Sequence, residues 1–302
     1  MDIRVSCGSE AKLGLRKIRV LAPSEIVYLL TRGICHASCD FCSQSGADET
    51  KKLSRVNWNV WEFDKILPLL HGQKRVCIQC LNYPEVYEDL LEMVKRIKAP
   101  ISISAQPFSL EEMHDLSKYV DKISISLDCF TRDLFKQYKS FYDWDLHWTR
   151  LKKAVEIFGT GNVISHLIVG LGESEFDAVK TMDKLFKCGA LPSLFAFTPI
   201  KGTKLSKMDP PKLGKYRRLQ IVRHLLLKDK LSINDIKFDR GRIVSIGDSI
   251  DHIESDAFRT QGCPDCNRPY YNEVPGHTIY NYPYELPDEN LKDLLKEAGL
   301  EQ

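Results

Sequence analysis

From about residue 25, the chain alternates short β-branched or apolar runs with longer amphipathic ones, and this alternation constrains its fold most. Six runs have the composition and length of strands, at residues 25–30, 75–80, 101–104, 122–128, 163–170 and 193–199. Helical patterns lie between them, at residues 57–70, 84–98, 109–119, 131–158 and 173–188. Strands that are each followed by such a helix form parallel βα units. Six in a row favour an α/β fold built on a whole or partial TIM-like βα barrel.

The pattern changes after Lys204. A basic amphipathic helix is predicted from Pro211 to Lys228, and its charges indicate either a solvated face or a docking patch for an acidic carrier domain. A strand at 236–239, a DRGR turn, a helical stretch ending at Gly262 and a short helix near 288–298 follow. The predicted organisation is an N-terminal segment (1–24), the barrel (25–205) and a C-terminal extension (206–302) that packs on the barrel.

Charge and hydropathy limit the partners. There are 43 Lys and Arg residues against 41 Asp and Glu, a net charge of +2, which does not indicate attraction to nucleic acid. The first twenty residues are studded with charge and lack an apolar signal region. No apolar run approaches the ~20 residues needed to span a bilayer. We therefore expect a cytoplasmic protein that binds neither nucleic acid nor membrane.

Seven of the ten cysteines fall into three tight groups. In a chain with no export signal such groups indicate metal ligands or catalytic thiols rather than disulfides. Cys35, Cys39 and Cys42 form CHASCDFC in the loop after the first predicted strand, where barrels build active sites. Three thiolates can hold three irons of a cubane and leave the fourth iron open, since a closed cluster needs four cysteine ligands. The alternative is a zinc site, although structural zinc prefers four ligands.

CHASCDFC, with the aromatic Phe41 before its third cysteine, resembles the signature of the radical S-adenosylmethionine superfamily. The resemblance extends over roughly residues 25–205. It implies that the three cysteines hold a 4Fe-4S cluster whose open iron binds S-adenosylmethionine. An electron from the cluster then cleaves this cofactor to methionine and a 5'-deoxyadenosyl radical.

Two later segments resemble cofactor-contacting parts of the same superfamily. ISLD (125–128) is similar to the ribose-contacting end of the fourth strand, and HLIVGLGE (166–173) to the adenine-contact motif, with His166 replacing its first glycine. CIQCLNYP stands where the superfamily commonly has a Gly-Gly-Glu stretch, so the contact to the methionine amino group is unassigned. The cofactor-binding residues implied by the resemblance are Phe41, Ser126, Asp128, Ile168, Gly170 and Glu173.

The remaining grouped cysteines are Cys77 with Cys80 in the second strand and Cys263 with Cys266 in GCPDC of the tail. Side chains alternate along a strand, so Cys77 and Cys80 can share a metal only if the strand ends or turns between them. The two pairs have the spacing of a bipartite metal site. It would hold an auxiliary 4Fe-4S cluster or zinc, unless the pairs do not meet.

The whole chain resembles the biotin-synthase-related group, in which sulfur is joined to unactivated carbon. RVCIQCLNYP is similar to the stretch that supplies a sulfur-donor cluster ligand in biotin synthase, and DRGR to the segment that supplies an arginine ligand, here Arg242. Ile164 stands where biotin synthase has another cluster cysteine. The tail GCPDCNRPYYNE resembles archaeal two-component lipoyl synthases. Residues after its last cysteine are substrate or auxiliary-site candidates, or a plain surface turn: Arg268, Tyr270, Tyr271 and Asn272.

This resemblance implies a sulfurtransferase of lipoate biosynthesis that inserts sulfur into protein-bound octanoyl-lysine, with the auxiliary cluster as sulfur donor. The implied partners are a lipoyl carrier protein (a dehydrogenase E2 lipoyl domain or glycine cleavage H protein), a paralogous second lipoyl synthase component and a low-potential electron donor. The alternatives are biotin-synthase-like sulfur insertion into a small molecule and a zinc-stapled binding module without catalysis. The three isolated cysteines are interpreted as buried filling or inert thiols: Cys7, Cys129 and Cys188.

Overall fold

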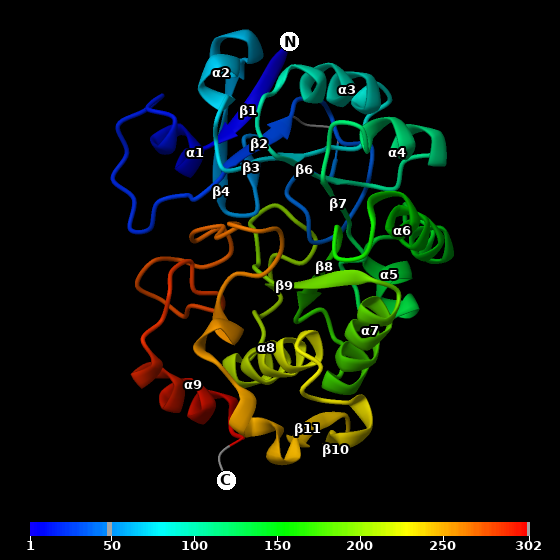
Figure 1. The fold of residues 1–302 in the computed structure, drawn as a ribbon, viewed down its shortest axis with the longest axis vertical. Coiled ribbons are helices and arrows are strands. Elements are labelled where there is room, and N and C mark those ends of the chain that lie inside the picture. The colour runs from blue at the N-terminus through cyan, green and yellow to red at the C-terminus, as the bar shows by residue number, and fades with distance from the viewer. Residues whose placement is uncertain (47–49, 301–302) are drawn as a thin grey trace.

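The computed structural model describes residues 1–46 and 50–300, and Figure 1 shows their arrangement. Within these ranges a nine-stranded sheet has the order β3-β4-β1-β2-β5-β6-β7-β8-β9. Its last six strands are parallel: β2 (Val27–Thr31), β5 (Val76–Gln79), β6 (Ile101–Ala105), β7 (Lys122–Ile125), β8 (Val163–Val169) and β9 (Ala190–Ala196). β9 lies at the sheet edge rather than beside β2, so the barrel is open. The prediction of a partial βα barrel with a C-terminal extension is confirmed.

Helices connect successive barrel strands, as the alternation predicted. They are α2 (Phe63–Leu70), α3 (Val86–Arg96), α4 (Leu110–Leu116), α5 (Arg132–Tyr138), α6 (Trp144–Phe158) and α7 (Glu175–Lys187). The single helix expected over 131–158 is wrong, because the chain breaks between α5 and α6. Asp143 caps α6 by accepting a hydrogen bond from the Leu146 N–H at 2.7 Å, which starts a new helix at that point.

The helix expected over 57–70 is also wrong in its first half. β4 (Val56–Glu62) occupies these residues, with Val56 and Trp58 buried and Asn57 exposed in the alternation of a strand. β4 pairs antiparallel with β3 (Lys52–Leu53) and with β1 (Asp2–Ser6). β1 is followed by α1 (Cys7–Lys12) and pairs with β2, so the N-terminal segment joins the barrel sheet.

The last barrel strand begins three residues before the predicted 193–199. It includes Pro192, which is tolerated because β9 is an edge strand. In the extension, the helical stretch expected to end at Gly262 consists of the 3₁₀ turns η2 (Gly247–His252) and η3 (Ser255–Phe258). The other elements there are α8 (Leu213–Leu227), η1 (Ile233–Asp235), β10 (Lys237–Asp239), β11 (Arg242–Ser245), η4 (Asp288–Asn290) and α9 (Leu291–Ala298).

One apolar cluster runs through the molecule, from Ile3 in β1 to Leu300 after α9. The barrel, the N-terminal segment and the extension therefore share a core. None of the helices in the described part of the chain combines the length and the apolar composition needed to cross a bilayer.

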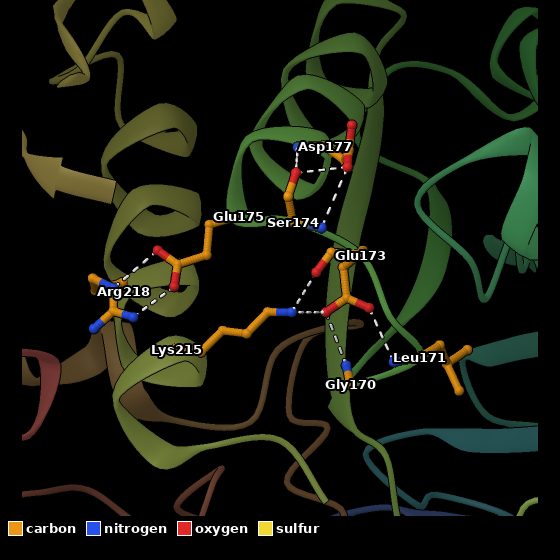
Figure 2. Close-up of polar contacts among 8 residues, drawn as sticks. All are labelled: Gly170, Leu171, Glu173, Ser174, Glu175, Asp177, Lys215 and Arg218. Atoms are coloured by element: carbon orange, nitrogen blue, oxygen red, sulfur yellow. Dashed lines mark hydrogen bonds and ion pairs between the residues drawn. The ribbon is translucent and has the colours of Figure 1, made fainter. Parts of the chain in front are cut away.

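The three arginines and His224 of the basic helix α8 are buried, so these charges form neither the solvated face nor the docking patch expected from the sequence. Arg217, Arg218 and Arg223 are each at most 6% exposed. Arg218 pairs with Glu175 at the start of α7, at 2.5 and 2.9 Å, as Figure 2 shows. Arg217 contacts Glu297 of α9 at 2.7 Å. The charges of α8 thus hold the barrel and the tail together.

Candidate active site in the barrel

All seven grouped cysteines line one pocket inside the open barrel, with a cavity volume of about 290 Å³. Cys35, Cys39 and Cys42 follow β2, at the carboxyl end of the parallel strands. Cys77 lies near the start of β5, toward the opposite end of the barrel. The pocket therefore has one thiol group at its mouth and another at its base.

The first cysteine loop is fixed to its surroundings through its backbone. The His36 N–H donates to the Asn82 carbonyl at 2.7 Å, and the Asp40 N–H donates to the Tyr138 carbonyl at 2.9 Å. The sulfur of Cys42 accepts a hydrogen bond from the Gln44 N–H at 3.4 Å. Backbone donors to sulfur favour the thiolate form, which is the form that binds metal.

The three thiols at the mouth are close enough to influence one another's ionisation. Burial raises the pKa of Cys42 to about 11, and the neighbouring Cys35 and Asp128 add to the rise. Burial also raises the pKa of Cys39, an effect that the charge of Lys139 opposes and Cys42 reinforces. Crowded, desolvated thiols ionise when a bound metal supplies positive charge. Their chemistry therefore fits a metal cluster.

Four of the six residues expected to contact S-adenosylmethionine line the pocket: Phe41, Ser126, Asp128 and Ile168. Asp128 has a positive φ of 60°, which turns its carboxylate at the end of β7. This carboxylate lies 2.9 Å from the ammonium of Lys139.

Gly170 and Glu173 are not among the residues that line the pocket. The Glu173 carboxylate accepts hydrogen bonds from the N–H groups of Gly170 and Leu171 at 2.9 and 3.0 Å, and it pairs with Lys215 at 2.6 Å (Figure 2). Gly170 has a φ of +109°, and an added Cβ would lie 2.9 Å from Pro211. Both residues shape the turn after β8 and do not line the pocket.

Lys139 was not predicted from the sequence, and its side chain is completely buried at the end of α5. Its ammonium donates to the Ser126 carbonyl at 2.5 Å and lies 3.4 Å from Nε2 of His147. Burial and the Lys139 charge lower the pKa of His147 to about 3, so this ring is neutral near pH 7. A single lysine in an aromatic-rich helix gives no pattern that separates it from a surface lysine.

His166 stands on β8 between the two ends of the pocket. Burial lowers its pKa to about 3, with further contributions from the charges of Arg268 and Lys139, so the imidazole is neutral near pH 7. Its ring lies 4.8 Å from that of Phe195. With Ile164 and Ile168 on the same strand, these side chains form a largely apolar wall from base to mouth.

Three of the four cysteines expected at the auxiliary site lie together at the base. Burial raises the pKa of Cys77, and the proximity of Cys263 and Cys266 raises it further. The Gln79 amide donates to the Cys77 sulfur at 3.0 Å. The hydroxyl of Tyr28, the register neighbour of Cys77, lies 3.5 Å from the Cys266 sulfur. The two distant segments therefore meet, as their spacing predicted.

Cys80 is set apart from these three. It follows the end of β5, and three residues of strand correspond to roughly 10 Å. Burial alone raises its pKa to about 12, with no contribution from another thiol. Because Cys80 lies beyond the carboxyl end of β5 while Cys77 lies near its start, the structure does not bring Cys80 into the group at the base.

The candidate site residues outside the cysteine groups also differ in whether they line the pocket. Arg268 and Tyr271 line the pocket, together with Asn272, whereas Tyr270 and Arg242 are not among the lining residues. The Arg268 guanidinium lies over the Phe195 ring at 3.7 Å. Arg242 is exposed in the β10–β11 hairpin, near the C-terminus at the bottom of Figure 1. This location does not suit a cluster ligand.

The isolated cysteines take ordinary structural positions. Cys129 is 1% exposed, in a small core with Phe135, Leu171 and Phe197. The Cys188 thiol donates to the Leu185 carbonyl at 3.1 Å, where α7 ends. Cys7 begins α1 and is partly exposed.

The side chains of the described residues do not place three His, Cys, Asp or Glu groups around a point that would hold a single metal ion. A single zinc ion needs its sulfur ligands about 2.3 Å away. A cluster of several irons is larger and holds its ligands farther apart. Three thiolates on one loop, as at the mouth, are ligands of the kind that a 4Fe-4S cluster uses.

No family model matches the chain. Biotin synthase from Psychrobacter cryohalolentis is 25% identical over 57% of this chain and 49% of its own length, so the chain spans about half of that protein. The [FeFe]-hydrogenase maturase HydG superposes with a TM-score of 0.54 at 14% identity, over 66% of this chain and 49% of HydG. Methylornithine synthase PylB gives a TM-score of 0.52 at 17% identity, over 64% and 59% of the two chains.

The HydG and PylB structures share this fold. The chain therefore has the partial βα barrel fold of HydG and PylB, and its sequence is similar to biotin synthase over about half of that enzyme's length.

Proposed function

We propose that this protein is a radical S-adenosylmethionine enzyme that inserts sulfur into an unactivated carbon chain. The observation that carries the proposal is the presence of two separate thiol groups in one pocket. Bound at the mouth, a 4Fe-4S cluster and S-adenosylmethionine would supply a radical able to remove hydrogen from carbon. A second cluster at the base would supply the sulfur.

Cys35, Cys39 and Cys42 would hold the first cluster, and Cys77, Cys263 and Cys266 the second. Ser126 and Asp128 at the end of β7 would bind the ribose hydroxyls of S-adenosylmethionine, and Phe41 and Ile168 would contact its adenine. Ile164, Ile168 and Phe195 give the space between the two thiol groups an apolar wall. An aliphatic chain placed there would lie between the radical formed at the mouth and the sulfur supplied at the base.

We further propose that the substrate is an octanoyl-lysine of a lipoyl carrier protein, so that the chain is one component of a lipoyl synthase. The apolar wall suits an acyl chain, and the CPDC tail that supplies the base cysteines is the segment that resembles the archaeal enzymes. The partners on this proposal are an E2 lipoyl domain or glycine cleavage H protein, the second synthase component and a low-potential electron donor.

An anaerobic assay tests this substrate. Incubated with S-adenosylmethionine and reductant, the reconstituted protein should add one sulfur atom to an octanoyl-lysine peptide and stop after about one turnover per chain, since its sulfur source is consumed. Mass spectrometry of the peptide measures the product. Addition of the second component should give the dithiolated peptide.

Cys77→Ala provides the matched control for this assay. It removes a base thiol and leaves the mouth intact, so 5'-deoxyadenosine should still form while the peptide gains no sulfur. Conversion of dethiobiotin with the peptide untouched would favour small-molecule sulfur insertion, as in biotin synthase. Bound zinc without iron at either group would favour the non-catalytic module.

Lys139 is a positioning residue on this proposal, because its ammonium holds the Asp128 carboxylate. Replacing it with Met should raise the dissociation constant for S-adenosylmethionine roughly tenfold, the equivalent of one lost charged hydrogen bond of about 1.5 kcal/mol. Calorimetry on the reconstituted protein measures this, and Lys139→Arg should recover part of the affinity. Lys136→Met, an exposed change on the same helix, is the control. Unchanged affinity in Lys139→Met would contradict the role.

A further inference from the structure

A buried serine at the base of the barrel has no hydrogen-bond partner for its hydroxyl among the described residues. Ser102 in β6 is 1% exposed, and its Oγ is unpaired. Buried serines on two other barrel strands are satisfied: Ser165 in β8 accepts from the Leu127 N–H at 3.1 Å, and Ser193 in β9 donates to the Gln261 carbonyl at 2.8 Å. A buried hydroxyl without a partner costs about 1–3 kcal/mol, so its presence requires an explanation.

Sheet register places Ser102 beside the base cysteines. Tyr28 of β2 pairs with Cys77 of β5, and Cys77 pairs with Ser102 of β6. Register neighbours of parallel strands share a face, and adjacent strands lie about 4.8 Å apart. Ser102 and Cys77 accordingly both line the pocket.

Ser102 also faces the tail cysteines. Cys263 and Cys266 line the pocket together with Ser102 and Cys77. The hydroxyl of Tyr28, which shares the register row of Cys77 and Ser102, lies 3.5 Å from the Cys266 sulfur. The Ser102 hydroxyl thus stands among thiols from two distant segments, yet within the described residues no hydrogen bond satisfies it.

We propose that Ser102 is the fourth protein ligand of an iron-sulfur cluster held at the base by Cys77, Cys263 and Cys266. The inference rests on the auxiliary cluster of the proposed function. A closed four-iron cluster takes four protein ligands, and the base supplies three thiols. The serine oxygen is the fourth ligand, and its proton passes to solvent when iron binds.

Two other groups near the base are less suitable. Cys80 lies roughly 10 Å farther along the strand. The Tyr28 hydroxyl is already engaged, since it accepts from the Arg268 N–H at 2.9 Å and contacts the Cys266 sulfur. Ser102 alone combines burial, register with Cys77 and an unsatisfied oxygen among these groups.

Iron analysis of a chain in which Cys35, Cys39 and Cys42 are all changed to Ala tests the assignment, because only the base can then bind a cluster. This parent should contain about four irons per chain after anaerobic reconstitution. Adding Ser102→Ala should remove about one iron in four, or the whole cluster, and give the electron paramagnetic resonance signal of a three-iron cluster where three irons remain. Ser102→Cys should restore the full iron content with a changed Mössbauer spectrum at one iron.

Ser104→Ala and Cys80→Ala are the matched controls. Ser104 is two residues along β6 on the same face of the strand, and its change should leave the iron content at the parent value, as should that of Cys80. Full iron content in Ser102→Ala would overturn the assignment, as would iron loss confined to Cys80→Ala. If the parent variant binds no iron, the base holds no auxiliary cluster, and the proposed function is then wrong as well. Thermal melting of each variant separates cluster loss from misfolding.

Discussion

Replacing Cys35, Cys39 and Cys42 together with Ala should abolish reductive cleavage of S-adenosylmethionine completely. These thiols are the group at the barrel mouth, beside the Asp128 carboxylate that would bind the ribose. Three ligands leave one iron of a cubane open to the cofactor, whereas a group with four ligands closes its cluster. Chromatography of 5'-deoxyadenosine after anaerobic incubation with dithionite measures the loss.

The matched control is a triple change at the base, with Cys77, Cys263 and Cys266 changed to Ala. It should leave cleavage of S-adenosylmethionine in place while removing the second cluster. Iron and sulfide analysis should find one cluster in each triple variant. Continued formation of 5'-deoxyadenosine by the mouth variant would show that the two groups have been assigned to the wrong ends of the pocket.

The parallel strands were predictable because hydrophobic periodicity is a local property. Elements that depend on distant partners were not. The 57–62 segment forms part of β4 because it pairs with β1, from Asp2 opposite Glu62 to Ser6 opposite Trp58. The spacing of its own apolar residues contains no information about that distant pairing. The break between α5 and α6 depends on the single Asp143 cap.

The candidate site also combines features that follow from local sequence with features that depend on distant parts of the chain. Motif residues near strand ends, such as Ser126 and Asp128, line the pocket because parallel strands end at a common edge. The meeting of Cys77 with Cys263 and Cys266 followed from spacing, but the separation of Cys80 required the end of β5. One signal was available for Ser102. A barrel strand buried on both faces should be continuously apolar, so the alternation in ISIS indicates a polar lumen.

The contacts of residues that act through the fold rather than through a motif were not predictable from the sequence. Glu173 matches a cofactor motif, yet its carboxylate is used by the backbone of the turn after β8 and by Lys215. The charges of α8 have the composition of an exposed surface, and only the packing of α7 and α9 around this helix shows that they are internal. Composition does not distinguish a solvated arginine from one paired in the core.

Arg218→Met should lower the free energy of unfolding by about 3–5 kcal/mol, because it leaves the Glu175 carboxylate buried without its cation. The pair is 7% and 5% exposed, and the guanidinium also donates to the Ala298 carbonyl at 2.6 Å, so α7, α8 and α9 all lose a contact. The melting temperature should fall by roughly 10 °C. Calorimetry or circular dichroism measures both quantities.

Two further variants separate charge from packing. Changing Glu175 to Leu together with Arg218→Met removes both charges and should recover much of the stability, since an apolar pair of similar volume can replace a buried ion pair. Lys212→Met at the exposed start of α8 should change stability by no more than about 0.5 kcal/mol. If Arg218→Met lowered the stability as little as Lys212→Met, the basic residues of α8 would be exposed surface charges. The docking patch for a carrier protein that the sequence indicated would then be supported.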